Sequence, residues 1–132
     1  MSSITAFLIV CQVATATGND ALLRTAKAVM QVESGGDPLV VGDGGRAVGA
    51  FQIHKIMVAE CNRIVVRQKW TMEDRIDPVK SLEMFKTYCL HYWPKGGPEQ
   101  WARGWNGGPN GPKRASTLDY WRKVNRIMQD GR

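Results

Sequence analysis

Apolar residues recur along most of the chain at the three- and four-residue spacing of an α-helix. The first such stripe consists of Leu22, Ala26 and Val29. Asn19 or Asp20 is placed to cap its amino end, and the glycines at 35–36 are placed to end it in the left-handed conformation. The pattern therefore predicts a first helix from about residue 19 or 20 to Ser34.

The same spacing predicts three further helices, over 55–66, from Asp77 onward and from Ser116 onward. Asp77 accepts hydrogen bonds from free amides, and Pro78 has no amide to lose in the first turn. Ser116 and Asp119 have the spacing of a capping box. The inner positions of the three helices are Met57, Cys61 and Ile64, then Leu82, Phe85, Cys89 and Tyr92, then Leu118, Trp121, Val124 and Met128.

Two glycine-rich stretches interrupt this helical pattern. Residues 40–50 alternate glycines with short β-branched pieces, which is typical of a small hairpin. A short helical segment over 99–103 precedes a predicted loop over 104–112. The predicted fold class is therefore α+β, mainly α-helical with one small β-hairpin.

The amino-terminal residues differ in composition from the rest. Residues 4–14 are nearly all apolar or small, which is shorter than the roughly 20 residues of a membrane span. Ala14, Thr15 and Ala16 then resemble a cleavage site, so we expect a signal peptide over 1–17 and a single domain over 18–132. The first three residues carry no Lys or Arg, so a buried amino-terminal segment remains the alternative.

The length of 132 residues fits one domain, which we expect to be monomeric. Eighteen Lys and Arg against 12 Asp and Glu give a net charge of +6, which favours anionic partners. The basic residues are spread along the chain and no nucleic-acid or phosphate-loop motif is present, so we expect no nucleic-acid partner.

The three cysteines form no CxxC pair and accompany only two histidines, so we expect no metal and no cofactor. Cys61 and Cys89 lie on apolar helix faces and are predicted to be free thiols. Export would change this expectation, because loss of Cys11 with a signal peptide leaves an even pair in an oxidising compartment.

Glu33 continues the apolar stripe of the first helix, which aims a carboxylate at the interior. The alternative is that the last helical turn directs it to solvent. If it is buried, loss of hydration and the negative end of the helix dipole both raise its pKa. A carboxyl group that stays protonated near neutral pH can donate its proton to a glycosidic oxygen.

Three motifs carry a family resemblance. Glu33, Ser34 and Gly35 end a helix, the sequence Gly-Ala-Phe-Gln-Ile follows the hairpin at 49–53, and Trp-Asn-Gly-Gly occupies 105–108. In this order and spacing the chain resembles the lytic transglycosylase (SLT) and goose-type lysozyme group. The resemblance implies a lysozyme-like fold with a cleft beside the hairpin, peptidoglycan glycan strands as substrate, and Glu33 as catalytic acid and base.

The resemblance also implies roles for residues near Glu33. Ser34 matches a serine that holds the catalytic glutamate in place, or it is an ordinary polar residue at a helix end. Gln52 matches a glutamine that binds a sugar amide, or it is a polar residue at a helix start. Asn106 matches an asparagine that binds backbone and sugar, or it is a turn residue. Trp105 stands where the family usually has tyrosine, so the phenolic hydroxyl is missing.

Three residues of the carboxyl-terminal third are further candidates for sugar binding. Trp105 and Trp101 offer indole rings on which pyranose faces pack, although Trp101 is equally well placed for a core role. Gly107 lies in the glycine-rich stretch, where a missing side chain lets backbone approach a ligand.

Asp43 decides between two reactions. If it is only a turn residue, Glu33 works alone and cleaves the β-1,4 bond between N-acetylmuramic acid and N-acetylglucosamine by lytic transglycosylation, which leaves a 1,6-anhydro sugar. If Asp43 acts as the second acid, water enters and the enzyme is a lysozyme. A wall-binding module without catalysis is the third alternative, although it would have no need of Glu33.

We expect export to the periplasm or the extracellular space, with a cytoplasmic phage-type lysin as the alternative.

Overall fold

The computed structural model describes the backbone of residues 2–131 and the side chains of residues 18–131. Its five α-helices are α1 (Ser2–Ser34), α2 (Lys55–Val65), α3 (Pro78–Tyr92), α4 (Pro98–Gly107) and α5 (Leu118–Asp130). Strands β1 (Val41–Gly42) and β2 (Ala47–Val48) pair antiparallel. Four short 3-10 helices are η1 (Asp43–Gly45), η2 (Met72–Ile76), η3 (Gly111–Lys113) and η4 (Ala115–Thr117). The predicted class, mainly helical with one small hairpin, is confirmed.

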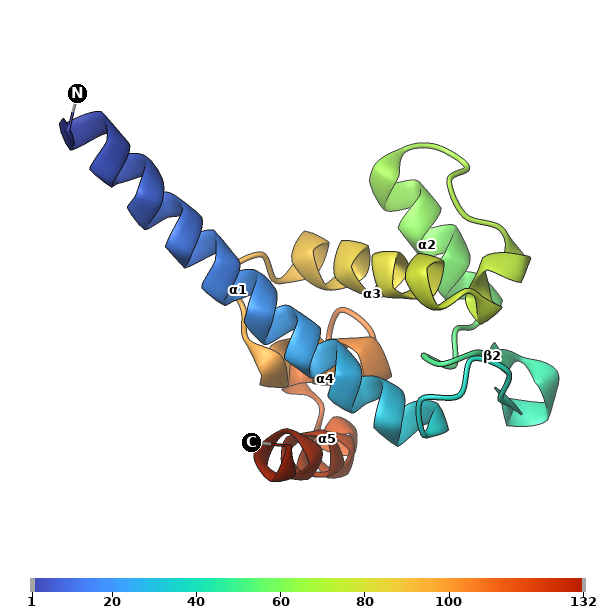
Figure 1. Ribbon diagram of the computed structural model, residues 1–132. Coiled ribbons are helices and arrows are strands. Elements are labelled where there is room, and N and C mark those ends of the chain that lie inside the picture. The colour runs from blue at the N-terminus through green and yellow to red at the C-terminus, as the bar shows by residue number, and fades with distance from the viewer. Residues whose placement is uncertain (1, 132) are drawn as a thin grey trace.

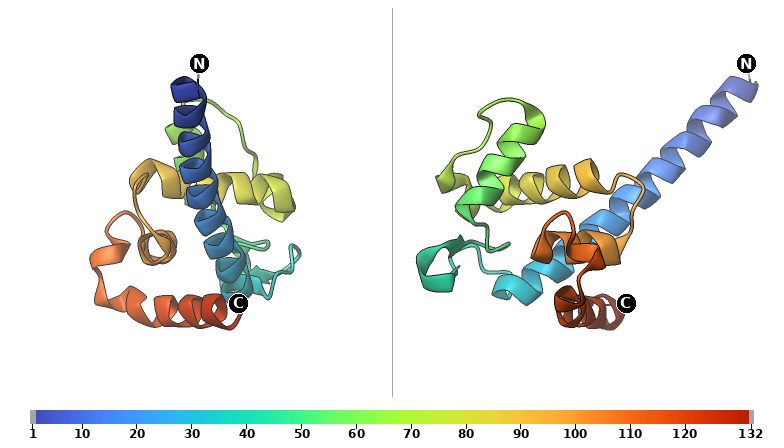
Figure 2. Two further views of the ribbon diagram at one scale, coloured as in Figure 1. Left: turned by 60° about the vertical axis from the view of Figure 1, so that its left-hand side comes forward. Right: turned by 180° about the vertical axis from the view of Figure 1, so that it is seen from behind.

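Helix α1 runs diagonally across the molecule, and its amino-terminal part projects beyond the other helices (Figures 1 and 2). Its carboxyl-terminal part packs on α3, α4 and α5, while α2 packs on α3. The hairpin lies at the carboxyl end of α1, opposite the projecting end (Figure 1). In the described part of the chain, no helix has the length and apolar character needed to cross a membrane.

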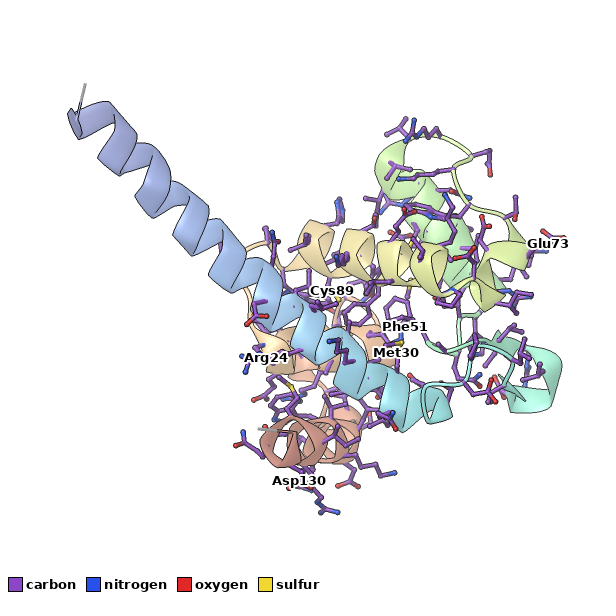
Figure 3. All side chains as sticks on the ribbon, viewed as in Figure 1. Arg24, Met30, Phe51, Glu73, Cys89 and Asp130 are labelled. Atoms are coloured by element: carbon purple, nitrogen blue, oxygen red, sulfur yellow. The ribbon has the colours of Figure 1, made fainter. Side chains whose placement is uncertain are left out.

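Aromatic rings join the loop after the hairpin to α3 and α4. Phe51 is fully buried and stacks on Phe85 of α3, with 5.1 Å between ring centroids. Trp105 of α4 packs edge-on against Phe85 at 5.1 Å and against Tyr88 at 5.8 Å. Figure 3 shows Phe51 and Cys89 among the central side chains, whereas Glu73 and Asp130 lie at the periphery. Burial of each such ring stabilises the fold by roughly 1.5–3 kcal/mol, so these rings fix the hairpin against the helices.

Several predicted boundaries are confirmed. α1 ends at Ser34, and Gly35 and Gly36 follow with φ of 68° and 83°. The Asp77 side chain caps α3 by accepting hydrogen bonds from the amides of Val79 at 2.9 Å and Lys80 at 3.0 Å. These boundaries depend on side chains within a few residues, and such local signals are readable from sequence.

The predicted start of the first helix is wrong. α1 begins at Ser2 and passes through Asn19 and Asp20 without a break. Gly18 is the one glycine between Ser2 and Ser34, and no proline lies there. A single glycine costs about 1 kcal/mol in a helix, which is too little to break α1 before Asn19. The predicted signal peptide falls on residues 1–17, whose side chains lie outside the described part.

The predicted loop over 104–112 is also wrong at its start, because α4 continues through Gly104 to Gly107. A Cβ at Gly104 would lie 1.8 Å from the Trp93 ring. Gly104 therefore serves a close contact between Trp93 and α4, and this packing overrides the low helix propensity of glycine.

The last helix begins at Leu118, after the single turn η4, and not at Ser116. The predicted capping box does not form, since Asp119 instead accepts a hydrogen bond from Arg122 at 2.7 Å.

Candidate active site

A cavity of about 480 Å³ lies where the end of α1, the hairpin, the start of α2 and the end of α4 meet. Its lining includes Glu33, Asp43, Gln52, His54, Trp105 and Asn106. A larger hollow of about 670 Å³ lies along another side of α2, beside Asn62, Arg67 and Trp70. The smaller cavity is the candidate active site, because it is the one that Glu33 lines.

Glu33 is partly buried in the last turn of α1. Burial raises its pKa from 4.5 to about 7, and a hydrogen bond from Tyr120 offsets part of this rise. The direction agrees with the prediction from the helix pattern. The carboxyl group is therefore divided between its neutral and ionised forms near neutral pH, which lets it both donate and accept a proton.

Tyr120 is the contact that sequence reasoning missed. Its hydroxyl donates a hydrogen bond to Glu33 Oε2 at 3.0 Å. Burial and the neighbouring Glu33 raise the pKa of the Tyr120 hydroxyl well above its usual range, so it remains a donor. The available signal was a second stripe on α5, in which Tyr120, Val124 and Ile127 recur at helical spacing.

Asp43 lines the same cavity from the hairpin side. Its backbone has a φ of 49°, which is uncommon for a residue other than glycine. Oδ1 accepts a hydrogen bond from Arg46 Nη2 at 3.1 Å, and Oδ2 lies 3.5 Å from Nε2 of His54. Both carboxylate oxygens therefore face a basic side chain. His54 was not predicted as a site residue, although it directly follows the motif at 49–53.

Ser34 belongs to the frame of the site. Its hydroxyl oxygen lies 2.7 Å from the carbonyl oxygen of Ala50 and 3.1 Å from that of Met30, and it accepts a hydrogen bond from the Gly36 amide. It is not among the cavity-lining residues, and its predicted role in substrate binding stays a prediction. Its hydrogen bond to Ala50 joins the helical turn that carries Glu33 to the loop after the hairpin, and so holds Glu33 in place.

Gln52 lines the cavity, but its amide nitrogen holds the hairpin. This nitrogen donates to the carbonyl oxygens of Val40 and Gly49, both at 3.0 Å. A Cβ on Gly42 would lie 2.5 Å from Gln52 Oε1, so a larger residue at this position would displace the Gln52 side chain. With both amide protons committed, Gln52 can contact a sugar only as an acceptor.

The chain matches the family model described as "Transglycosylase SLT domain" over residues 11–128. It belongs to this family. No curated protein and no solved structure gave a significant match. The lysozyme-like fold expected from the resemblance is thereby confirmed, and family membership supports peptidoglycan lytic transglycosylase activity in general, with peptidoglycan as the class of substrate.

In this SLT domain, Trp105 and Asn106 lie on the last turn of α4 and line the cavity. Trp105 is only 8% exposed, and its indole nitrogen donates to the carbonyl oxygen of Phe51 at 3.3 Å. It forms part of the cavity wall and offers no open ring face. Asn106 is exposed, so its side-chain amide is accessible from the cavity.

Trp101 and Gly107, the two other predicted sugar contacts of the SLT domain, lie away from the cavity. Trp101 is 4% exposed, and its indole nitrogen donates to the carbonyl oxygen of Trp93 at 3.0 Å, so it belongs to the core. A Cβ on Gly107 would lie 2.5 Å from the Thr117 methyl group, so this glycine permits close packing against η4. Neither residue lines the cavity, and their roles in sugar binding stay predictions.

Cys61 and Cys89 are buried free thiols, as the helix pattern predicts. The Sγ of Cys61 lies 3.5 Å from the carbonyl oxygen of Met84, which it can donate to. Across the side chains that the structure describes, no cluster of three or more His, Cys, Asp or Glu residues is suited to hold a metal ion.

Proposed function

We propose that this SLT domain cleaves the β-1,4 bond between N-acetylmuramic acid and N-acetylglucosamine by lytic transglycosylation, with Glu33 as acid and then base. The observation that carries the proposal is a partly buried carboxyl group on a cavity, with a pKa raised to about 7. General acids poised in this way contribute about 100-fold to 10,000-fold to a rate.

In the first step the neutral Glu33 gives its proton to the glycosidic oxygen as the bond from that oxygen to C1 of N-acetylmuramic acid breaks, and C1 takes on oxocarbenium character. The N-acetylglucosamine side leaves with a free hydroxyl group, and Glu33 becomes a carboxylate. The Tyr120 hydroxyl, 3.0 Å from Oε2, stabilises this charge as it forms.

In the second step the carboxylate takes the proton of the muramic acid C6 hydroxyl, whose oxygen bonds to C1. This closes a 1,6-anhydro ring and returns Glu33 to its neutral form without consuming water. A pKa near 7 suits both steps, because the same group must release a proton and then recover one.

Hydrolysis with Asp43 as the second acid is the other candidate function, since Asp43 lines the same cavity. The contacts of Asp43 favour transglycosylation. Its two oxygens face Arg46 and His54, so a water molecule would have to compete with these basic side chains for Asp43. A wall-binding module without catalysis is disfavoured, because binding alone does not need an acid with a raised pKa.

The test is the mass of the products from purified glycan strands. Transglycosylation gives anhydro products that are lighter than hydrolysis products by one water. Glu33→Gln is expected to abolish both cleavage and the clearing of cell-wall suspensions, while Asp43→Asn keeps the anhydro product. Unchanged clearing by Glu33→Gln would remove the catalytic role, and a reducing-end product that depends on Asp43 would establish hydrolysis.

We also propose that the protein acts in the periplasm or outside the cell, as the composition of residues 1–17 suggests. A cytoplasmic phage-type lysin is the alternative. Mass spectrometry of the protein recovered from each cell fraction tests this, because cleavage near Ala16 removes a defined segment.

A further inference from the structure

A second hollow adjoins the candidate active site. It has a volume of about 200 Å³, and it shares Ile56, Met57 and Gly108 with the cavity that Glu33 lines. Its remaining lining residues are Glu60, Tyr88, Tyr92 and Pro109. The cleft therefore extends along α2 to α3, and Asp43 does not line this extension.

We propose that this hollow is a separate subsite for an N-acetylhexosamine, with Glu60 accepting the acetamido N–H and Ile56 and Met57 contacting the acetamido methyl group. The proposal rests on the proposed function, because it concerns the glycan strand that Glu33 would cleave. It assigns residues that none of the three sequence motifs contains.

Glu60 has a free place for one more donor. Its Oε1 accepts hydrogen bonds from Arg63 Nη2 and from the Tyr92 hydroxyl, the latter at 2.7 Å, and its Oε2 accepts one from Arg63 Nε at 3.2 Å. A carboxylate offers about four acceptor positions, so one position on Oε2 remains. The side chain of Glu60 is 26% exposed, which leaves it within reach of a ligand in the hollow.

The charge around Glu60 selects a neutral donor. Hydrogen bonds from Arg63 and Tyr92 lower the pKa of Glu60, so the group is an anion at neutral pH. Arg63 already compensates that charge and would repel a second cation, while Glu60 would repel an anionic ligand. The neutral donors that remain are a hydroxyl and an amide N–H, and either bonds more strongly to a charged acceptor than to a neutral one. The apolar side chains of Ile56 and Met57 in the same hollow favour the amide, because an acetamido group carries a methyl group beside its N–H.

The apolar part of the hollow suits a methyl group. Ile56 is 79% exposed on α2, at the boundary between the cavity and the hollow, where a bound group would cover it. Removing this apolar surface from water favours binding of an apolar group. Tyr92 packs against Tyr88 at 5.0 Å and Trp93 at 5.6 Å, which keeps its hydroxyl on Glu60 before any ligand arrives.

The experiment measures binding in a Glu33→Gln background, in which the probes are not consumed. Oligomers of N-acetylglucosamine with two to six sugars are titrated calorimetrically, and cello-oligosaccharides of equal length serve as probes without acetamido groups. We expect the affinity for N-acetylglucosamine oligomers to rise sharply at the length that fills the hollow, and that for cello-oligosaccharides to show no such rise.

Glu60→Ala is expected to lower the affinity for N-acetylglucosamine oligomers that fill the hollow by about tenfold. This is the effect of losing one hydrogen bond to a charged group. Ile56→Ala is expected to lower the same affinity by several-fold. Asp119→Ala is the matched control, because it removes an acid from a similar (i, i+3) pair with Arg122, on α5 and outside the cleft. Thermal melting of each variant checks that it is folded.

The proposal is overturned if Glu60→Ala and Ile56→Ala bind every oligomer as the parent does. It is also overturned if cello-oligosaccharides show the same rise, because the hollow would then not recognise the acetamido group. Absence of cleavage by the wild type would instead remove the proposed function, and the binding result would be unaffected.

Discussion

Tyr120 donates its hydroxyl hydrogen bond to Glu33 at 3.0 Å, although the two residues are 87 positions apart in the chain. The first residue of the pair comes from α5 and the second from the last turn of α1, so the contact exists only because these helices pack together. This hydrogen bond lowers the pKa of Glu33, whereas burial raises it. The balance of the two effects leaves Glu33 with a pKa near neutrality.

Tyr120→Phe tests this balance. Loss of the hydrogen bond should raise the pKa of Glu33 further, so the apparent pKa in the pH profile of kcat should move upward. We expect kcat to fall about tenfold at neutral pH, because the carboxylate formed during the reaction loses a donor.

Tyr88→Phe is the control for this variant, since the Tyr88 hydroxyl bonds to the carbonyl oxygen of Gly104 and not to Glu33. It should leave the pH profile in place. An unchanged profile for Tyr120→Phe would show that the phenol does not influence Glu33.

The raised pKa of Glu33 makes stability depend on pH. Its folded value of about 7 exceeds the reference value of 4.5, so the folded state binds more protons between these values and stability falls as pH rises through this range. Glu33→Gln should therefore be more stable than the wild type by up to about 3 kcal/mol at pH 8. Urea unfolding at pH 8 and at pH 4 measures the difference, which should nearly vanish at pH 4.

Gly104→Ala should be strongly destabilising. Its Cβ would enter the Trp93 ring at 1.8 Å, and overpacking of this kind costs roughly 1–3 kcal/mol or more. Gly97→Ala is the matched control at the start of α4, because no atom lies within 4 Å of its Cβ position. Thermal melting should separate the two variants by several degrees, and equal melting temperatures would contradict the packing explanation.

Cys61 and Cys89 should be unreactive in the folded protein. Burial raises the pKa of Cys61 to about 12 and that of Cys89 well above its usual range, so the thiolate that attacks a disulfide reagent is scarce. Labelling with a thiol reagent followed by peptide mapping should find both residues unmodified until denaturant is added. Rapid labelling of either residue in the native protein would show that these helices open readily.

Sequence alone determined the features that depend on neighbours in the chain. The end of α1 at Ser34, the Asp77 cap and the hairpin between residues 41 and 48 follow from glycine conformation, capping and alternation. Glu33 was readable as an inward carboxylate because it continues an apolar stripe. The order of three short motifs identified the family, which the match over residues 11–128 confirms.

Only the tertiary structure decided which side chains meet. It placed Trp101 in the core and Trp105 in the wall, continued α4 through Gly104, and gave Ser34 a hydrogen bond to the loop after the hairpin. It also brought Tyr120 to Glu33. Helical spacing specifies which face of a helix a residue occupies, but the partner on that face is set by the packing of distant segments.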